Sequence, residues 1–522
     1  MADTRHGYQR DAHGANSADR GGRRRTYDRP ESRDTRRDVS APRSTQHGSE
    51  SGRSHAPRTG RYRTDRQGER PGSGRYREAN PRDEREMDGR RSAWREDDAR
   101  RTRDSRDTWY DDDPREDFVP EDFDDAPVGA PQRSDLYCPV AARCGGCEWL
   151  AMPYGAQLDM KQARIEELFS DIDVEVEPIV GMDDPRHFRN KVQLPFAPGR
   201  PDRNGRTTAC WGIFERGSHR IVPCRTCLVE DERARPIIAA IAELLPRFNI
   251  KPYSERTNSG FLRYCLVRTA LHTGQVMLTL VASSNRLPSA KTFIERLRAE
   301  HPEITTIVLN VNPERTSVIL GKQERVLFGP GYIEDEICGC TFRISSSSFY
   351  QTNPIQAERL YDLAIEMAEL SEGDHFGDAY CGTGTIGIAA AVRSGARLLG
   401  VERNADAIED ARANAEANGL SAEQAEFVVG DAGGVFARMA RAGEHLDVVF
   451  MDPPRAGSTT AFLANLAKLG PRRVVYVSCE PRTQRHDIAE LARFGYRVRR
   501  IRPVDMFPHT DHVENVVLLE RR

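Results

Sequence analysis

Two residues late in the sequence bring together a nucleophile and a proton acceptor. Cys479 follows the apolar run 473–478, and Glu514 stands at the start of the apolar run 513–520. A thiol becomes a strong nucleophile once it is ionised, and a carboxylate within hydrogen-bond reach can act as a general base. Each residue alone also has a structural interpretation, because cysteines are often buried for packing and a strand can begin with a solvated Glu. Together they predict covalent catalysis.

A glycine-rich turn predicts a site for a nucleotide-like ligand. The segment DAYCGTGTIG places Gly382, Gly384 and Gly387 in a G-x-G-x-x-G pattern, and Glu402 ends the next apolar run. Glycines let the backbone approach a ligand, and a carboxylate at the end of the following strand accepts hydrogen bonds from ribose. The pattern fits a dinucleotide, S-adenosylmethionine or a purely structural turn.

The segment DVVFMDPPRAG favours S-adenosylmethionine among these alternatives. Asp452 ends an apolar run, where open α/β sheets place their ligands. Pro453 and Pro454 remove two backbone donors and stiffen the loop. Such an acidic-prolyl loop is typical of enzymes that transfer methyl groups to planar bases, and dehydrogenases do not usually carry it.

Five of the eleven cysteines form a second candidate site. Cys138, Cys144 and Cys147 have C-x5-C-x2-C spacing, and Cys224 or Cys227 is the candidate for a fourth ligand. Four thiolates can hold zinc or an iron–sulfur cluster. The spacing does not choose between these two metals, and a site without metal is the third alternative.

The elements that must position these residues alternate in the C-terminal part. Apolar periodicity predicts a helix over 355–370 and then strands and helices in turn. The predicted strands are 375–380, 398–402, 426–429, 447–451, 473–478 and 513–520, and the helices are 385–394 and 404–419. This alternation predicts a mostly parallel, doubly wound sheet with Asp452 and Cys479 at one edge.

The middle of the chain has an α+β pattern. We predict helices over 236–245 and 291–299 and strands over 275–282, 305–311 and 317–320. Two polar runs, Arg189–Asn190–Lys191 and Arg216–His219–Arg220, fit phosphate contact or plain solvation.

The N-terminal part differs in composition. Residues 1–130 contain no Leu, Ile or Lys, and residues 1–110 hold 28 Arg against 20 acidic residues. Residues 111–130 hold one Arg against nine acidic residues. Such a segment cannot bury a core, so we predict a disordered arm over 1–133 that contacts RNA or has no fixed function. Without a signal or membrane segment, the expected location is cytoplasmic.

Nine motifs in order carry a family resemblance over residues 136–522. They are CPVAARCGGC, FRNKVQ, SHRIVPCRTC, SFYQTN, DAYCGTGT, GVERN, DPPRAG, VSCEPRT and DMFPHTDHVE. The chain resembles the RNA uracil-5-methyltransferases that act on 23S ribosomal RNA and on tRNA. The resemblance implies a Rossmann-like class I methyltransferase domain over 341–522 and an α+β domain over 134–340 that binds RNA and an iron–sulfur cluster.

The resemblance also implies roles for individual residues. Cys479 would be the nucleophile and Glu514 the base. The implied S-adenosylmethionine contacts are Gln351, Tyr380, Glu402 and Asp452. The implied ligands of a [4Fe-4S] cluster, with zinc as the alternative metal, are Cys138, Cys144, Cys147 and Cys227. Glu480 departs from the Asn that often follows the nucleophile, which puts the local loop contacts in doubt.

C5 methylation requires both a nucleophile and a base. C5 of uracil is a poor nucleophile until a thiolate adds to C6 and converts the ring to an enolate. The methylated adduct then loses its C5 proton to a carboxylate, and the thiolate leaves. The uracil ring itself must leave any helical stack before the enzyme can reach it.

We expect a monomer that acts on structured RNA, not DNA. We favour 23S rRNA over tRNA because the cysteine cluster looks like that of the ribosomal branch. The alternatives are methylation of tRNA uridine 54, RNA cytosine-C5 methylation and a non-catalytic iron–sulfur RNA-binding protein.

Overall fold

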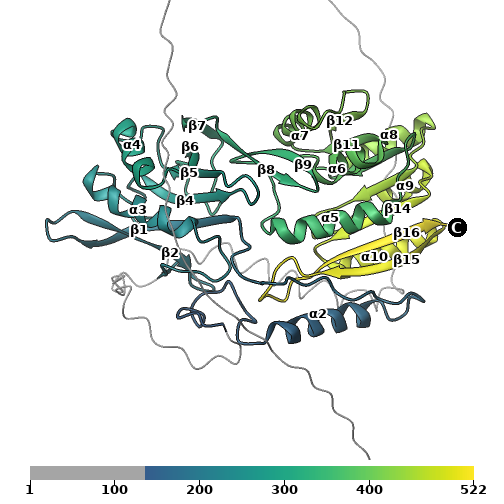
Figure 1. Ribbon diagram of the computed structural model, residues 1–522, viewed down its shortest axis with the longest axis horizontal. Coiled ribbons are helices and arrows are strands. Elements are labelled where there is room, and N and C mark those ends of the chain that lie inside the picture. Colours follow the sequence, from purple (N-terminus) through teal and green to yellow (C-terminus); the bar gives the residue numbers. More distant parts are fainter. Residues whose placement is uncertain (1–135) are drawn as a thin grey trace, which may run out of the picture. The chain divides into compact units, whose positions relative to one another are not determined.

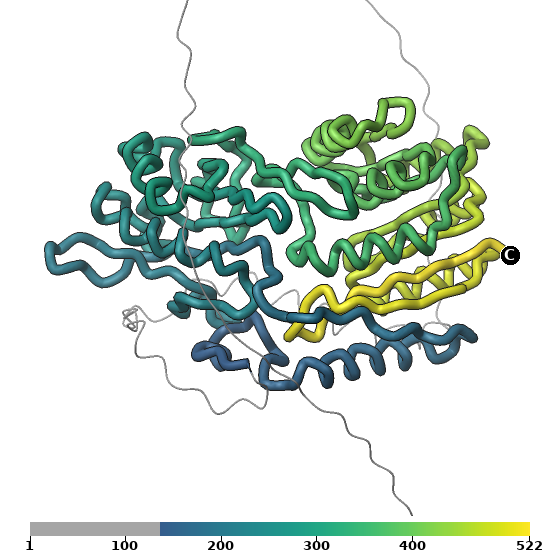
Figure 2. The backbone as a smooth tube through the Cα atoms, in the orientation of Figure 1, coloured from purple at the N-terminus to yellow at the C-terminus, as the bar shows by residue number. Residues whose placement is uncertain are grey.

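A computed structural model describes residues 136–522 (Figures 1 and 2), and the arm predicted over 1–133 lies outside them. These residues form two seven-stranded sheets and a two-stranded hairpin. Among them no helix is long and apolar enough to span a membrane.

The first sheet is mostly antiparallel, with strand order β3-β2-β1-β4-β5-β6-β7. Its strands are β1 Lys191–Pro201, β2 Thr207–Phe214, β3 Ile221–Pro223, β4 Leu262–Thr269, β5 Val276–Ala282, β6 Ile304–Val311 and β7 Gln323–Phe328. Only β5 and β6 pair in parallel, and α4 (Ala290–Glu300) connects them. Helix α3 (Ala234–Arg247) buries Ile237, Ile241 and Leu244 at helical spacing, so its apolar stripe helps to close this core.

The second sheet has strand order β12-β11-β10-β13-β14-β16-β15. Its strands are β10 His375–Ala379, β11 Arg397–Glu402, β12 Ala425–Val429, β13 Val448–Met451, β14 Arg473–Ser478, β15 Tyr496–Val504 and β16 Glu514–Arg521. The first five of these pair in parallel, whereas β16 runs antiparallel to both β14 and β15. This arrangement is the predicted doubly wound sheet with one antiparallel strand inserted near its edge.

Helices cover both faces of the second sheet (Figure 1). One core contains side chains of α5 (Pro354–Ala368), α6 (Thr385–Ser394) and α7 (Ala405–Ala417). The other core contains side chains of α8 (Ala432–Ala442), α9 (Thr460–Leu469) and α10 (Pro481–Arg493). The strands between them are apolar on both faces, as expected for a sheet that is covered on both sides.

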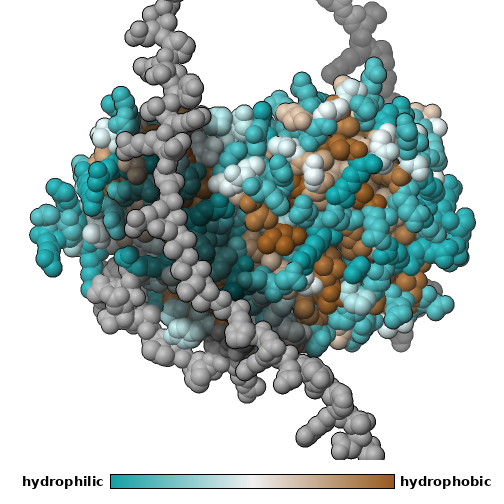
Figure 3. All heavy atoms as spheres, viewed as in Figure 1, coloured by the Kyte–Doolittle hydropathy of each residue, from teal (hydrophilic) through white to brown (hydrophobic). Residues whose placement is uncertain are grey.

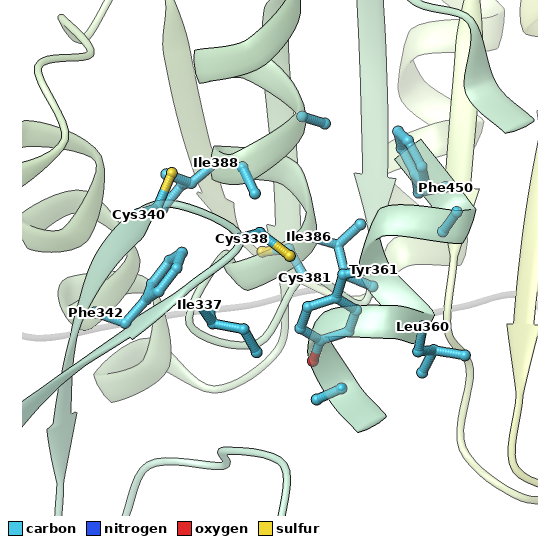
Figure 4. Close-up of a cluster of buried hydrophobic side chains, with 14 of the residues drawn as sticks. Ile337, Cys338, Cys340, Phe342, Leu360, Tyr361, Cys381, Ile386, Ile388 and Phe450 are labelled. Carbon is cyan, nitrogen blue, oxygen red and sulfur yellow. The ribbon is translucent and has the colours of Figure 1, made fainter. Parts of the chain in front are cut away.

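The hairpin of β8 (Tyr332–Ile337) and β9 (Cys340–Ser345) packs between the two seven-stranded sheets. Its inward side chains pack with Met277 and Val308 of the first sheet and with helices of the second. Figure 4 shows Ile337 and Phe342 gathered with Ile386 and Ile388 of α6. Figure 3 shows that the surface over the first sheet is mostly hydrophilic in this view, with more apolar residues over the second.

Helix α2 (Tyr154–Leu168) precedes the first sheet in sequence but packs against the second, beside β15 and α10 (Figure 1). Lys161 Nζ lies 2.6 Å from Asp505 Oδ1, and both side chains are 0% exposed. Tyr154 donates a hydrogen bond of 2.7 Å to the other oxygen of Asp505. The loop between β15 and β16 is therefore anchored to α2.

The element predictions were confirmed except for one strand. The predicted helices and the other strands match observed elements to within a few residues. The predicted strand 317–320 is wrong, and the next strand begins at Gln323. Asn312 Nδ2 donates to the carbonyls of Val318 and Ile319 at 2.7 and 3.0 Å. A side chain thus takes carbonyls that a strand neighbour would otherwise use.

Candidate functional site

Strand pairing brings Cys479 and Glu514 to the same edge of the second sheet. Ser478 of β14 is the register partner of Asn515 of β16, so the residue after one strand faces the first residue of the other. Cys479 is partly exposed, whereas Glu514 is only 5% exposed. The predicted nucleophile and base are therefore neighbours, and Cys479 is the more exposed of the two.

Three carboxyl groups line this edge, and we call them the acidic edge: the buried Asp378 and Glu514 and the half-buried Asp452. Burial raises the pKa of Asp378 and of Asp452 to about 7. Burial, together with the charge of Asp452, raises the pKa of Glu514 to about 8. A carboxyl group with a pKa near neutrality can both accept and return a proton under physiological conditions.

The Cys479 thiol is influenced by these carboxyl groups and by Arg455. Burial raises the pKa of Cys479, and the charges of Glu514 and Asp452 raise it further. Arg455 opposes this rise through its charge and through a hydrogen bond to the thiol. Arg455 also donates a hydrogen bond of 3.0 Å to His512 Nδ1. It is therefore the cation that favours the thiolate.

The glycine-rich turn is held by the carboxylate that ends β11. Glu402 accepts hydrogen bonds from the amides of Gly382 at 3.3 Å and Asn404 at 2.8 Å. Gly382 has φ 56°, and no atom lies within 4 Å of the position a Cβ would take. The turn therefore presents open backbone beside a carboxylate, as a ligand with a ribose requires.

Tyr380 leaves β10 in the left-handed region, with φ 71°. A non-glycine residue there is uncommon and is often found at functional sites. Its hydroxyl lies 3.3 Å from Ser458 Oγ, and its ring packs against Phe462 at 5.6 Å between centroids.

Gln351 reaches this site from the loop before α5. Its side chain hydrogen-bonds the buried Tyr361 hydroxyl, whose pKa also responds to the charge of Asp452. Asn353, two residues later, caps α5 by accepting from the Gln356 amide at 3.2 Å. The four residues predicted to contact S-adenosylmethionine thus surround the carboxyl ends of β10, β11 and β13.

Three residues of this site were missed by the sequence interpretation. Asp378 accepts a 3.0 Å hydrogen bond from the Gly387 amide, and the Asp that opens DAYCGTGT was the available signal. Arg455 lies inside the motif DPPRAG, where a cation three residues after Asp452 was a usable signal. Tyr361 had none, because an aromatic residue on a helical stripe normally predicts only core packing.

The five clustered cysteines line one cavity together with Arg235. Burial and the nearby thiols of Cys227, Cys144 and Cys138 raise the pKa of Cys147 to about 12. The cysteines that the sequence grouped therefore do meet. Within residues 136–522, however, no three His, Cys, Asp or Glu side chains have a geometry that would hold a metal ion.

The two polar runs have different environments. Arg216 and Arg220 form ion pairs with Glu148 and Glu215. In the other run, Asn190 points inward and donates to the Gln351 carbonyl at 3.1 Å. Its side chain is thus part of the scaffold.

Comparison with protein families and sequences identifies relatives over most of the described chain. The family model for tRNA (uracil-5-)-methyltransferase matches residues 316–522. An RNA methyltransferase of Bacillus cereus is 39% identical over 396 residues, covering 75% of this chain and 84% of the relative. Another, from Halalkalibacterium halodurans, is 40% identical over 395 residues, covering 75% and 84%.

A solved structure is similar to this chain in both fold and sequence. Pyrococcus abyssi tRNA (uracil-54, C5)-methyltransferase, in complex with S-adenosyl-L-homocysteine, superposes with a TM-score of 0.60 at 30% identity. The match covers 72% of this chain and 86% of that protein.

Proposed function

The chain belongs to the tRNA (uracil-5-)-methyltransferase family of RNA methyltransferases, and from that premise we propose that it methylates C5 of a uridine in RNA. The observation that carries this proposal is the apposition of the Cys479 thiol and the Glu514 carboxyl group at the edge that Asp452 and the glycine-rich turn share. S-adenosylmethionine supplies the methyl group when bound, in keeping with the S-adenosyl-L-homocysteine in the Pyrococcus abyssi structure.

Different residues of the site would contact different parts of the methyl donor. Glu402 and the open backbone at Gly382 fit the ribose and the adjoining part of the donor. Tyr380, Gln351 and Asp452 line the neighbouring strand ends. Each presents a polar group, and Asp452, with a pKa of about 7, can adapt its charge to a cationic ligand.

The reaction begins at Cys479. Its thiolate, favoured by Arg455, attacks C6 of the uracil ring, and a C6–S bond forms while the C5–C6 double bond opens toward O4. C5 then takes the methyl group from the bound donor, whose sulfur would keep the electron pair of the broken S–CH3 bond. Glu514, as a carboxylate, removes the C5 proton, the C5–C6 double bond returns and the Cys479 thiolate leaves.

Trapping of a covalent adduct tests this mechanism. RNA that contains 5-fluorouridine cannot lose its C5 substituent as a proton, so incubation with the methyl donor should leave a protein–RNA adduct that survives denaturation. Cys479→Ala should give no adduct, whereas Cys210→Ala, at a buried cysteine of β2, should give as much as the native chain. An adduct in the Cys479→Ala protein would overturn the assignment.

We propose 23S rRNA as the substrate, on the strength of the cysteine cluster. The tRNA alternative is favoured by a different observation, because both the matching family model and the Pyrococcus abyssi protein are described as tRNA enzymes. Mapping 5-methyluridine in rRNA and tRNA from cells that lack the gene distinguishes these substrates. Loss of the modified base from tRNA alone would refute the rRNA assignment.

We also propose that Cys138, Cys144, Cys147 and Cys227 hold a [4Fe-4S] cluster. What supports this proposal is their shared cavity and the softness of thiolate donors, and zinc is the alternative for the same donors. Protein purified without oxygen should contain iron and sulfide and absorb near 400 nm. Zinc alone, or no metal, would refute the cluster.

A further inference from the structure

Three cationic side chains meet where β1 pairs with β4, and we call them the cation cluster: Arg189, Lys191 and Arg268. Lys191 is the first residue of β1 and the register partner of Arg268. Arg189 lies two residues before Lys191 and donates a hydrogen bond of 3.2 Å from Nε to the Lys191 carbonyl. Like charges opposite each other on antiparallel strands repel, so this arrangement requires a compensating interaction.

No carboxylate among residues 136–522 pairs with the cation cluster. Arg268 is only 4% exposed, and both terminal nitrogens of its guanidinium donate to one neutral acceptor, the Ser348 carbonyl, at 3.0 Å. The Lys191 ammonium has neither a hydrogen bond nor an ion pair in this part of the chain, and only the two arginines act on its charge. Burial of unpaired charge is costly, which makes the cluster unlike an ordinary solvated face.

The other basic run shows what an ordinary face looks like in this protein. Arg216 lies 3.1 Å from Glu148, and Arg220 Nε lies 2.6 Å from Glu215. These side chains are more exposed than those of the cation cluster and still have acidic partners. The lack of a carboxylate therefore distinguishes the cation cluster from this second basic run.

The cation cluster borders the loop that enters the candidate active site. The Asn190 amide donates to the Thr352 carbonyl at 2.9 Å, and Arg268 is bonded to Ser348 of the same loop. Between them stands Gln351, whose side chain contacts Tyr361 near Asp452. The hydroxyl of Thr352 is buried and has no hydrogen-bond partner. The loop thus has both a spare donor and a cationic neighbour.

We propose that the cation cluster binds a phosphodiester of the RNA strand, next to the uridine held at Cys479; this inference rests on the proposed function. Lys191 and Arg189, which are partly exposed, would contact the phosphate oxygens, and Arg268 would supply positive charge from beneath. A phosphate would supply the negative charge that no carboxylate within residues 136–522 provides to these three cations.

The titration of the cluster agrees with this geometry. Burial and the charges of Arg268 and Arg189 lower the pKa of Lys191 to about 8. Burial lowers the pKa of Arg268 to about 10. A bound phosphate would reverse the charge repulsion, so RNA binding should be accompanied by uptake of a fraction of a proton near pH 8.

Salt-dependent binding of oligouridylate to the full chain tests the proposal without any methyl transfer. The variant Lys191→Met should bind about tenfold more weakly at moderate salt, as expected for loss of a charge-assisted contact. The slope of log affinity against log salt should fall by about 0.7, the value for one phosphate on a single strand. The matched control is Lys291→Met, at an exposed lysine of α4 paired with Glu295, and it should behave as the native chain.

Two further measurements decide what the cluster binds. With an oligouridine whose linkages are neutral methylphosphonates, Lys191→Met should bind as well as the native chain. Affinity for S-adenosyl-L-homocysteine should be unchanged. A native salt slope in Lys191→Met, or no native binding to oligouridylate even at low salt, would overturn the proposal. Weaker binding of S-adenosyl-L-homocysteine would instead assign the cluster to the carboxylate of the methyl donor. Failure of the adduct experiment would overturn the catalytic mechanism and leave these binding results unaffected.

Discussion

The acidic edge and the cation cluster each gather ionisable side chains of one sign that form no salt bridge within residues 136–522, and the two signs are opposite. At the acidic edge, burial raises the pKa of Glu514 to about 8. At the cation cluster, burial and like charges lower the pKa of Lys191 to about 8. In each case the folded protein favours the neutral form. The acidic edge retains a carboxyl group that can accept a proton. The cation cluster retains uncompensated positive charge that an anion can neutralise.

A third region shows the compensated case. Lys161 and Asp505 are as deeply buried as any member of the first two sites, but they neutralise each other at 2.6 Å. Tyr154 adds a hydrogen bond to Asp505. A buried pair of opposite charge thus anchors α2, whereas the ionisable side chains of the acidic edge and the cation cluster form no salt bridge within residues 136–522.

The largest effect is expected from Glu514→Gln at the acidic edge. Glutamine keeps the shape but cannot accept the C5 proton, so turnover should fall by about 10²- to 10⁴-fold. Adduct formation on normal RNA should persist, with slow release. Single-turnover kinetics that separate the two steps provide the measurement. Fast release in this variant would exclude Glu514 as the base, and Glu480→Gln, at the residue after the nucleophile, serves as the control.

The next effect is expected from breaking the compensated pair. Asp505→Asn leaves Lys161 charged, buried and unpaired, which should lower the free energy of unfolding by about 3–5 kcal/mol. Urea unfolding measures the loss. The double variant Lys161→Met/Asp505→Asn should lose less than the sum of the single variants. Additive losses would show that the two side chains do not interact.

The smallest effects are two opposite pH dependences of stability. The pKa of Glu514 rises from 4.5 to about 8 on folding, so the unfolded chain releases this proton first and stability falls as pH rises through that window. Glu514→Gln removes this loss, and its advantage in melting temperature should grow from pH 4.5 to pH 8.

Lys191 gives the opposite sign. Its pKa falls from 10.5 to about 8 on folding, so the charged form destabilises the protein below pH 8 and the penalty disappears as pH rises to 10.5. Lys191→Met should therefore be more stable than the native chain at neutral pH, with an advantage that fades toward pH 10.5. Differences that do not vary with pH in either variant would contradict the comparison.

Sequence patterns predicted the second sheet well because its elements are locally consistent. Alternating apolar runs and helical stripes predicted β10 to β14. Because parallel strands end at one edge of a sheet, the sequence alone also predicted that Asp452 and Cys479 lie together. The antiparallel pairing of β14 with β16 then places Glu514 beside Cys479.

The features that the sequence did not reveal depend on polar side chains in buried places. Helix α2 buries Gln157 and Lys161 on its packed face, which erases the apolar stripe that periodicity would detect. Arg268 is buried within β4, and nothing in LRYCLVRT distinguishes it from an arginine at an exposed strand position. The roles of both residues follow from tertiary contacts.

The pairing of β14 with β16 has a consequence for how this catalytic centre can vary. Side chains alternate between the faces of a sheet, so a slip of one residue would turn Glu514 away, and a slip of two would move it by roughly 7 Å. The backbone thus offers only a few widely spaced settings for the gap between nucleophile and base. Fine adjustment is left to the length of the side chain at position 514, which makes Glu514→Asp the smallest change in reach that the architecture permits.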